Sequence, residues 1–201
     1  MLRLYDYLAS GNGYKVRLVL AHLGLAYERI ELDIDEGETR TAEFLARFPN
    51  GKVPALELED GGVLWESNAI AFYLAEGTPL LPGERLDRAR VLQWMFFEQY
   101  SHEPYIAVAR YIVQHLELDE ERRALLESKR APGYRALGVM EGRLAAHDFL
   151  VRDRYSIADI ALYAYTHVAD EGGFDLAGFP AIRAWLARVR EQPGHIPITQ
   201  G

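Results

Sequence analysis

The chain has 201 residues, of which 49% are hydrophobic and 26% are charged, a balance typical of a folded globular protein. Its formal net charge of −8 disfavours nucleic acid and anionic membrane surfaces as partners, because like charges repel. The absence of cysteine excludes a disulfide framework, thiolate metal ligands and a redox thiol of the protein's own, so any thiol chemistry needs a thiol from a ligand.

Strand and helix patterns alternate in the first third of the chain. The expected elements, in chain order, are a strand over 2–6, a helix over 15–23, a strand over 27–32, a helix over 39–46, strands over 55–59 and 63–65, and a helix from 67 to 75. Gly24 is expected to end the first helix, Asp60-Gly61-Gly62 indicates a hairpin turn, and Ser67 is the expected N-cap of the last helix. The order βαβαββα predicts an α/β domain with a mixed sheet over residues 1–76.

The rest of the chain has helical spacing of its apolar residues. Residues 77–86 predict a linker, because two prolines and two glycines lie in its first seven positions, and residues 87–201 predict an all-helical second domain. Pro104 lies inside the first long helix and is expected to kink or divide it. The further expected breaks lie at Ala131-Pro132-Gly133, around Phe149 to Arg154, at Gly172-Gly173 and at Pro193.

No apolar stretch of the sequence is long enough for a membrane. Crossing a bilayer takes about 20 consecutive apolar residues, and none of the uncharged stretches approaches that length. The first ten residues also lack a basic segment followed by an apolar run. We therefore expect a cytoplasmic protein without a membrane partner.

The heptapeptide SGNGYKV, Ser10 to Val16, has three interpretations from its residues alone. A phosphate-binding loop is disfavoured, because Val16 stands where the third glycine of G-x-G-x-x-G would be. A nucleophilic serine is disfavoured, because the G-x-S-x-G elbow is absent. In the third interpretation Ser10 is an N-cap or turn residue beside glycines that supply positive φ. The heptapeptide alone is not sufficient to assign a function.

Two later segments, NGKVPAL (residues 50–56) and WESNAI (residues 65–70), add the decisive signal. With SGNGYKV and SIADIALYAY (residues 156–165), they occur in an order and spacing that resembles the cytosolic glutathione transferase superfamily over essentially the whole chain. The resemblance implies a thioredoxin-like α/β domain followed by a helical domain, glutathione as co-substrate, and a homodimer.

The resemblance also implies which residues bind glutathione. It implies a cis peptide bond between Val53 and Pro54, with the N–H and C=O of Val53 paired to the cysteinyl backbone. Ser67 and the positive end of its helix suit the α-carboxylate of the γ-glutamyl group, and Glu66 suits its ammonium. Lys52 could meet the glycyl carboxylate. An ordinary turn at Val53-Pro54, a plain N-cap at Ser67 and a solvated Lys52 are the alternatives.

Ser10 occupies the position at which serine-type members of the superfamily donate a hydrogen bond to the glutathione sulfur. A free thiol has a pKa of about 8.5, and lowering this pKa by about two units takes roughly 2.7 kcal/mol of preferential thiolate stabilisation. One charge-assisted hydrogen bond contributes about 1.5 to 3 kcal/mol, so Ser10 and the helix start suffice together. Asn12 is a second candidate donor, and Tyr5 and Tyr7 are alternatives, because other members use a tyrosine at the end of the first strand.

The second domain carries a folding signal and a weaker ligand signal. Ser156 to Asp159 form a capping box, so Asp159 is assigned no catalytic role. The resemblance makes the helix around Tyr100 and Tyr105 a wall of the electrophile pocket, although helical aromatic residues usually belong to the core. The six histidines show no metal-ligand spacing, so no metal site is expected.

The expected reaction is attack of the glutathione thiolate on a small hydrophobic electrophile, a conjugation typical of detoxification. Thiol-disulfide exchange of the cysteine-type members is excluded, because position 10 is serine and the chain has no cysteine. Two alternatives stay open. The same fold could serve as a non-catalytic glutathione-binding or protein-interaction module, or the thiolate could act in isomerisation, dehalogenation or peroxide reduction.

Overall fold

A four-stranded mixed sheet organises the first part of the computed structural model, which describes residues 1–201. Its strands are β1 (Leu2–Asp6), β2 (Tyr27–Glu31), β3 (Ala55–Glu57) and β4 (Val63–Trp65). The strand order is β2-β1-β3-β4, with β1 parallel to β2 and the other pairs antiparallel. The predicted mixed sheet is confirmed.

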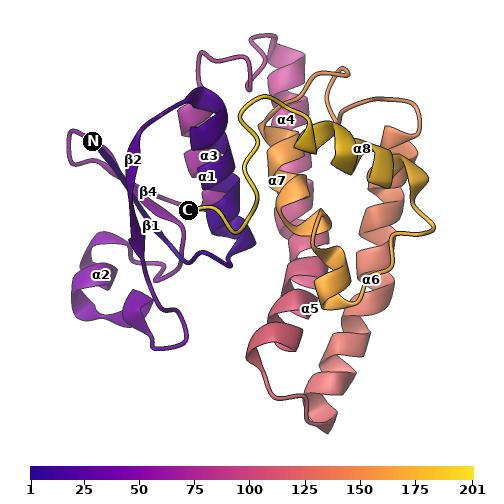
Figure 1. Cartoon of the computed structure of the whole chain (residues 1–201), viewed down its shortest axis with the longest axis horizontal. Helices are drawn as coiled ribbons and strands as arrows, with labels where there is room; N and C mark the ends of the chain where they lie inside the picture. Colours follow the sequence, from indigo (N-terminus) through magenta and orange to yellow (C-terminus); the bar gives the residue numbers. More distant parts are fainter. The chain divides into compact units, whose positions relative to one another are not determined.

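Helices cover both faces of this sheet (Figure 1). Helices α1 (Gly11–Leu23) and α3 (Ser67–Ala75) pack side by side on one face, and the short helices η1 (Glu38–Arg40) and α2 (Ala42–Arg47) lie on the other. Leu4 and Leu56 are opposite each other in the register of the sheet and are fully buried. The next pair, Tyr5 and Ala55, points to the other face and packs with Phe44 of α2, because side chains alternate along a strand. The predicted thioredoxin-like α/β fold is therefore confirmed.

Two helix starts in this part differ from the sequence prediction. Helix α1 begins at Gly11 rather than residue 15, because Ser10 caps it and its Oγ accepts the N–H of Gly13 at 3.2 Å. Ser67 is not the N-cap of α3: that position belongs to Glu66, and Ser67 is the first helical residue. The end of α1 agrees with the prediction, since Gly24 has the left-handed conformation, with φ 63°.

The second part of the chain is helical, as predicted. Its elements are α4 (Arg85–Phe97), the π-helical turn η2 (Glu98–His102), α5 (Glu103–His115), α6 (Glu120–Leu144), α7 (Ile157–Thr166), η3 (Ala169–Gly172) and α8 (Pro180–Arg190). Pro104 lies in the first turn of α5, where its missing N–H is tolerated, and the π-helical turn before it divides the long helix. None of these helices combines the length and apolar character that crossing a membrane requires.

The predicted break at Ala131-Pro132-Gly133 is wrong, because α6 continues through it. Packing outweighs the lost hydrogen bond at Pro132. The ring of Phe174 lies so close to Gly133 that a Cβ atom there would be 2.4 Å from the ring. Ala136, Leu137 and Met140 are buried on the following turns, so tertiary contacts hold the part of the helix that follows the proline.

The chain forms two compact units, and their composition differs from the expected one at the C-terminal end. Unit 1 consists of residues 1–78 and 193–201, and unit 2 of residues 79–192. Residues 193–201, here called the return segment, were expected in the helical domain. Instead they pack on α1, where the hydroxyl of Tyr14 donates a 2.6 Å hydrogen bond to the carbonyl of Ile196.

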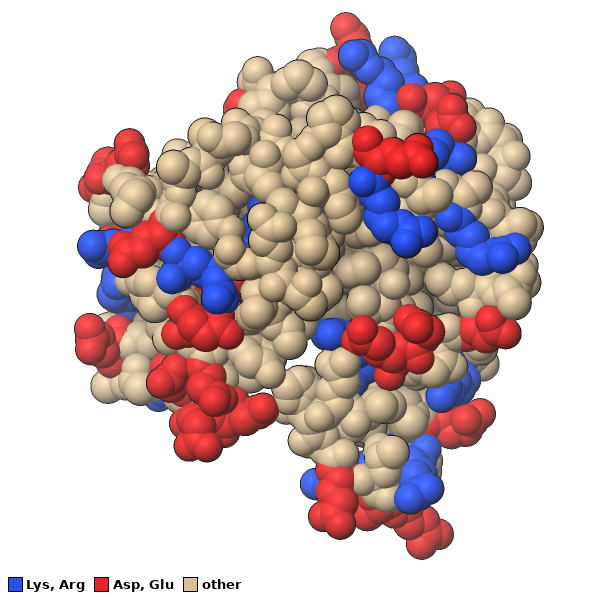
Figure 2. All heavy atoms as spheres, viewed as in Figure 1, with Lys and Arg blue, Asp and Glu red and all other residues tan.

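Charge is distributed unevenly on unit 1. Figure 2 shows acidic side chains gathered around α2 and the segment before it, where Asp33, Asp35, Glu36 and Glu38 are exposed. This part of the surface repels anions, so an anionic ligand of unit 1 depends on cations and N–H groups close to its site.

The capping box of α7 is confirmed and is tied to the core of unit 2. Asp159 is fully buried and accepts hydrogen bonds at 3.0 Å from the backbone N–H groups of Leu150 and Ser156 and from the indole of Trp185. Burial raises the pKa of Asp159 to about 6, and these hydrogen bonds oppose that rise. Asp159 thus connects the start of α7, the loop before it and α8.

Replacing Asp159 by Ala is expected to lower the free energy of unfolding of unit 2 by about 3 kcal/mol, because several buried donors lose their acceptor. Chemical denaturation followed by tryptophan fluorescence measures this change. The control is Asp148→Ala, since Asp148 makes only an exposed ion pair with Arg188 and its loss is expected to cost about 1 kcal/mol or less. Equal effects of the two substitutions would contradict the assigned role of Asp159.

Candidate functional site

Three chain segments meet at one end of the sheet in unit 1. Strand β1 ends there at Asp6 and leads through a short loop to Ser10. Because Tyr5 pairs with Ala55 and Ala55 pairs with Trp65, the turn before β3 and the residues after β4 reach the same end. The sheet register thus brings together the loop with Ser10, the turn with Val53-Pro54 and the start of α3.

Ser10 has a hydroxyl that is available to a ligand. Its Oγ accepts the Gly13 N–H, its backbone N–H donates to the carbonyl of Tyr7 at 2.8 Å, and no acceptor lies within reach of its O–H. The side chain is half-buried at the positive end of a 13-residue helix. A hydroxyl donor at a helix start favours a bound anion over its protonated form.

Asn12 links the two helix starts. Its Oδ1 accepts one hydrogen bond from the hydroxyl of Ser67 at 3.2 Å and another from the ammonium of Lys15 at 2.8 Å. Lys15 is fully buried. The structure therefore brings Asn12 and Ser67 together and adds a cation that the sequence analysis missed. The available signal was its position in SGNGYKV, three residues after Asn12 on the same helix.

Glu66, before α3, has an unusual backbone conformation. Its φ is 71° and its ψ is 112°, a left-handed region that non-glycine residues rarely adopt and that costs about 1 to 3 kcal/mol. Its carboxylate accepts a 2.9 Å hydrogen bond from the side chain of Asn50, in the turn that carries Lys52. Such outliers cluster at functional sites, where the surrounding structure holds them in place.

The turn before β3 presents its backbone. The Val53-Pro54 peptide bond is cis, as the resemblance implied, and the N–H and C=O of Val53 have no hydrogen-bond partner. Lys52 is exposed and makes no ion pair. Val53 is therefore able to pair with an extended peptide, and Lys52 is able to bind an anion.

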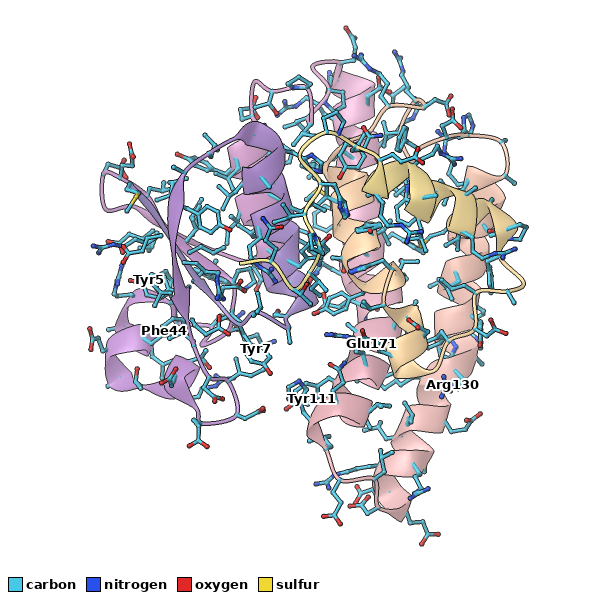
Figure 3. All side chains as sticks on the ribbon, in the orientation of Figure 1. Tyr5, Tyr7, Phe44, Tyr111, Arg130 and Glu171 are labelled. Atoms are coloured by element: carbon cyan, nitrogen blue, oxygen red, sulfur yellow. The ribbon has the colours of Figure 1, made fainter.

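Tyr5 and Tyr7, the two alternative donors to the sulfur, lie in different surroundings. The hydroxyl of Tyr5 lies 2.7 Å from a guanidinium nitrogen of Arg47 and 3.2 Å from a carboxylate oxygen of Glu57. Figure 3 shows Tyr5 beside Phe44, on the sheet face that carries α2. Tyr5 thus has a structural role on the face opposite α1, whereas Tyr7 lies in the loop that leads to Ser10.

A buried ion pair lies below the Ser10 loop. The Nε of Arg17 is 2.9 Å from Oδ2 of Asp6, and both side chains are fully buried. Asp6 also explains a glycine in the first turn of α1, because a Cβ atom on Gly13 would lie 1.6 Å from Asp6 Oδ1. Burial raises the pKa of Asp6 to about 6, while the charge of Arg17 opposes the rise. The only sequence signal for this pair was an arginine inside an apolar helix.

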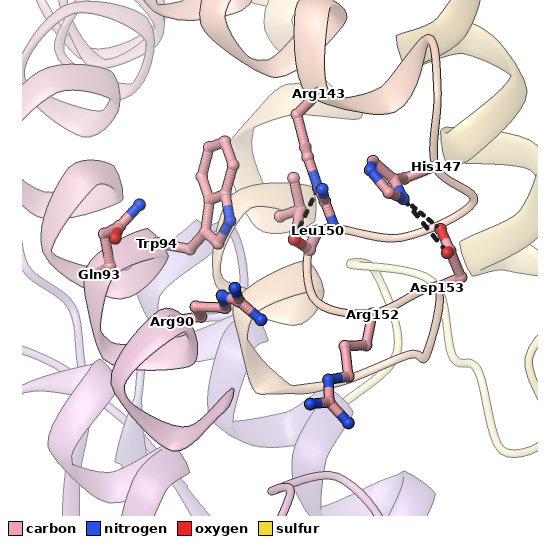
Figure 4. Close-up of a pocket in the computed structure, with 8 residues that line it drawn as sticks. All are labelled: Arg90, Gln93, Trp94, Arg143, His147, Leu150, Arg152 and Asp153. Carbon is pink, nitrogen blue, oxygen red and sulfur yellow. Dashed lines mark hydrogen bonds and ion pairs between the residues drawn. The ribbon is translucent and has the colours of Figure 1, made fainter. Parts of the chain in front are cut away.

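Unit 2 places the two predicted pocket tyrosines differently. Tyr100, in the π-helical turn, is 85% exposed, whereas Tyr105 lines a cavity of about 280 Å³ with Phe97 and Ser101. A second cavity, of about 520 Å³, also lies in unit 2 (Figure 4). Its lining residues are Arg90, Gln93, Trp94, Arg143, His147, Leu150, Arg152 and Asp153.

Comparisons with known proteins agree with this architecture. Residues 1–76 match the N-terminal domain of glutathione S-transferase, and residues 94–193 match its C-terminal domain. A glutathione S-transferase structure from Pseudomonas fluorescens is 56% identical, has a TM-score of 0.97 and shares 99% of both chains. The structure of Ure2p in complex with glutathione is 29% identical, with a TM-score of 0.86, and covers 96% of this chain and 90% of that one.

The chain is also similar to a protein whose name describes a transcriptional regulator. Transcriptional regulator URE2 of Saccharomyces cerevisiae is 31% identical over 98% of this chain, which spans 67% of that regulator's length. The fold and the two domain matches define a thioredoxin-like domain joined to a helical transferase domain. The chain belongs to the glutathione S-transferase family.

The carboxyl group of Asp6 is expected to titrate near pH 6 in the folded protein, rather than at its ordinary value of 3.8. The native state then binds more protons than the unfolded chain between these values, so the contribution of Asp6 to stability falls as pH rises through this window. The midpoint of this titration is measured by NMR from the chemical shift of the Asp6 carboxyl carbon as pH is varied. The signal is identified by its loss in the variant Asp6→Asn. A midpoint near 4 would contradict the assigned burial.

Proposed function

We propose that this protein is a glutathione transferase that holds the glutathione sulfur as a thiolate beside Ser10 for attack on a small electrophile. The observation that carries the proposal is the convergence at one end of the sheet. An uncommitted serine hydroxyl, the backbone of Val53 and the start of α3 lie together there, as the register of β1, β3 and β4 requires.

Each polar group of glutathione has a partner at this end of the sheet. The free backbone groups of Val53 pair with the cysteinyl residue in the manner of an added strand. The N–H groups at the start of α3 accommodate the γ-glutamyl carboxylate, toward which the Ser67 hydroxyl turns from Asn12. The Glu66 carboxylate receives the ammonium. The exposed Lys52 meets the glycyl carboxylate, which supplies a local cation in a protein of net charge −8.

We assign stabilisation of the thiolate to Ser10 rather than to the other candidate donors. The Ser10 O–H is uncommitted and lies at the start of α1, whereas the hydroxyl of Tyr5 is bound to Arg47 and Glu57 on the other face of the sheet. One hydrogen bond to a thiolate contributes about 1.5 to 3 kcal/mol, and the start of α1 adds about 0.3 to 1 kcal/mol. These contributions suffice to lower the thiol pKa by about two units. Asn12 is the second donor, through its amide nitrogen.

The reaction follows from the thiolate. The thiol proton passes to water when glutathione binds, and the sulfur then attacks the electrophilic carbon. A C–S bond forms while the bond to the leaving group breaks, and the leaving group departs with its electron pair. The protein contributes orientation and stabilisation of the anion, with no covalent enzyme intermediate. The assignment of Tyr100 and Tyr105 to the electrophile remains a prediction.

We also propose that the protein forms a homodimer. Val63, Trp65 and Tyr73 of β4 and α3 are 38%, 41% and 52% exposed, which gives unit 1 an apolar surface for a second copy of the chain.

The second candidate function is glutathione binding without turnover. It is favoured by the similarity to a relative named as a transcriptional regulator and to Ure2p, whose structure is in complex with glutathione. Isomerisation, dehalogenation and peroxide reduction would use the same thiolate and remain further alternatives.

Ser10→Ala is expected to raise the pKa of the bound thiol by about one to two units, because one donor to the sulfur is lost. At a pH below the bound thiol pKa of both proteins, the dissociation constant of glutathione is expected to change by less than about threefold. The thiolate ultraviolet band, titrated against pH, measures the shift. Tyr5→Phe is the control and is expected to leave this pKa unchanged. An unchanged thiolate band in Ser10→Ala would remove Ser10 from the role.

Turnover is tested separately from binding. The protein is expected to be retained on immobilised glutathione and to conjugate a general aryl halide, with a rate that follows the ionisation of the bound thiol as pH rises. Retention without conjugation of aryl halides or epoxides, and without reduction of peroxides, would favour the binding module over the transferase.

A further inference from the structure

We propose that the return segment, residues 193–201, positions the Ser10 loop through Arg17, so that thiolate stabilisation depends on a segment from the far end of the chain. Arg17 is then a positioning residue, which acts on the sulfur only through Leu8 and Ser10. The inference rests on the proposed function, and its test separates the two.

The return segment is held along α1 by several contacts. Nδ1 of His22 lies 2.7 Å from the carbonyl oxygen of Pro193, and the Tyr14 hydroxyl donates to the carbonyl of Ile196 at 2.6 Å. Gly194 has a φ of 82° and lies so close to α1 that a Cβ atom there would be 3.1 Å from the carbonyl oxygen of Ala21. These contacts fix the path of the segment.

The guanidinium of Arg17 joins this segment to the loop. One terminal nitrogen donates to the carbonyls of Ile198, at 2.8 Å, and Gln200, and the other donates to the carbonyl of Leu8 at 2.6 Å. The remaining nitrogen, Nε, pairs with Asp6. The two terminal nitrogens thus have hydrogen-bond acceptors, Nε has only the ion pair with Asp6, and the side chain is fully buried.

Leu8 is fixed at both of its backbone polar groups. Its carbonyl is bound by Arg17, and its N–H donates to a carboxylate oxygen of Glu31 at 3.0 Å. Ser10 follows two residues later, and its own N–H donates to the carbonyl of Tyr7. The place of the Ser10 hydroxyl therefore depends on where Arg17 and Glu31 hold Leu8.

The return segment matters to the loop because Arg17 is a rigid, planar donor with fixed directions. Without the carbonyls of Ile198 and Gln200, one buried guanidinium nitrogen would lose both of its acceptors. Leaving a buried charged donor unsatisfied is costly, so the group would shift toward water and draw the Leu8 carbonyl with it. Small displacements of a donor weaken anion stabilisation, because hydrogen bonds depend steeply on distance and angle.

The test removes residues 198–201 from the full chain and compares the variant with Arg17→Lys. A lysine retains the charge for Asp6 but, as a compact ammonium on a flexible stem, does not bridge Asp6, Leu8 and the return segment together. For both variants we expect the thiol pKa of bound glutathione to rise by about one unit, which is a tenfold loss of thiolate below that pKa. Measured at a pH below the thiol pKa of both bound forms, the dissociation constant of glutathione is expected to change by less than about threefold.

The control is Leu20→Ala, a cavity in the same helix farther from Ser10. Leu20 is fully buried, so this variant lowers stability and is expected to leave the thiolate pKa unchanged. A purely structural role of the return segment would make the truncated protein resemble Leu20→Ala, with lower stability and an unchanged pKa.

The outcomes distinguish this inference from the proposed function. If the unaltered protein does not lower the thiol pKa of bound glutathione, the proposed function fails. If it does, and the truncated protein retains the same pKa, the inference is overturned. If the truncated chain does not fold, Arg17→Lys decides alone: a raised pKa supports the inference and an unchanged pKa overturns it.

Discussion

The buried ion pair between Asp6 and Arg17 is the interaction on which the functional end of unit 1 depends. It joins the end of β1 to α1, and through Arg17 it reaches Leu8 and the return segment. Taking two charges out of water is costly unless their hydrogen-bonding groups are satisfied. The carbonyls satisfy the two terminal nitrogens of the guanidinium. Gly13 belongs to the same arrangement, because the Asp6 carboxylate occupies the space that a side chain would need.

The site above this pair is built from the ends of secondary structure elements rather than from a cleft lined by charges. Two helix starts and one turn present a hydroxyl, N–H groups and a carbonyl at the same end of the sheet. This arrangement suits an extended anionic peptide in a protein whose net charge is −8, because partial charges at helix ends act over short distances and are little affected by the acidic surface around α2. The strained conformation of Glu66 is held by the turn and by α3 on either side of it.

The sequence allowed the fold to be predicted because most of its elements have clear local signals. Alternating and helical spacing identified the sheet and the helices, and Gly24 and the capping box at Ser156 ended or began helices as expected. The short motifs also located Ser10, Val53-Pro54 and Ser67, which the sheet register brings to one end. The starts of α1 and α3 differed from the prediction by local capping, and the other failures depended on tertiary contacts. Pro132 stays helical because the part of α6 that follows it is buried. The partners of Arg17 at Ile198 and Gln200 are too distant in sequence for any local pattern to indicate.

The central claim is that a serine hydroxyl of the protein stabilises a sulfur anion that a bound tripeptide supplies. The most direct measurement is the distance between the glutathione sulfur and Ser10 Oγ in a crystal structure of the complex. The account predicts a hydrogen-bonding distance, with the cysteinyl backbone of glutathione paired to Val53. A sulfur that lies beyond reach of Ser10, against the hydroxyl of Tyr7 or away from both, would contradict it.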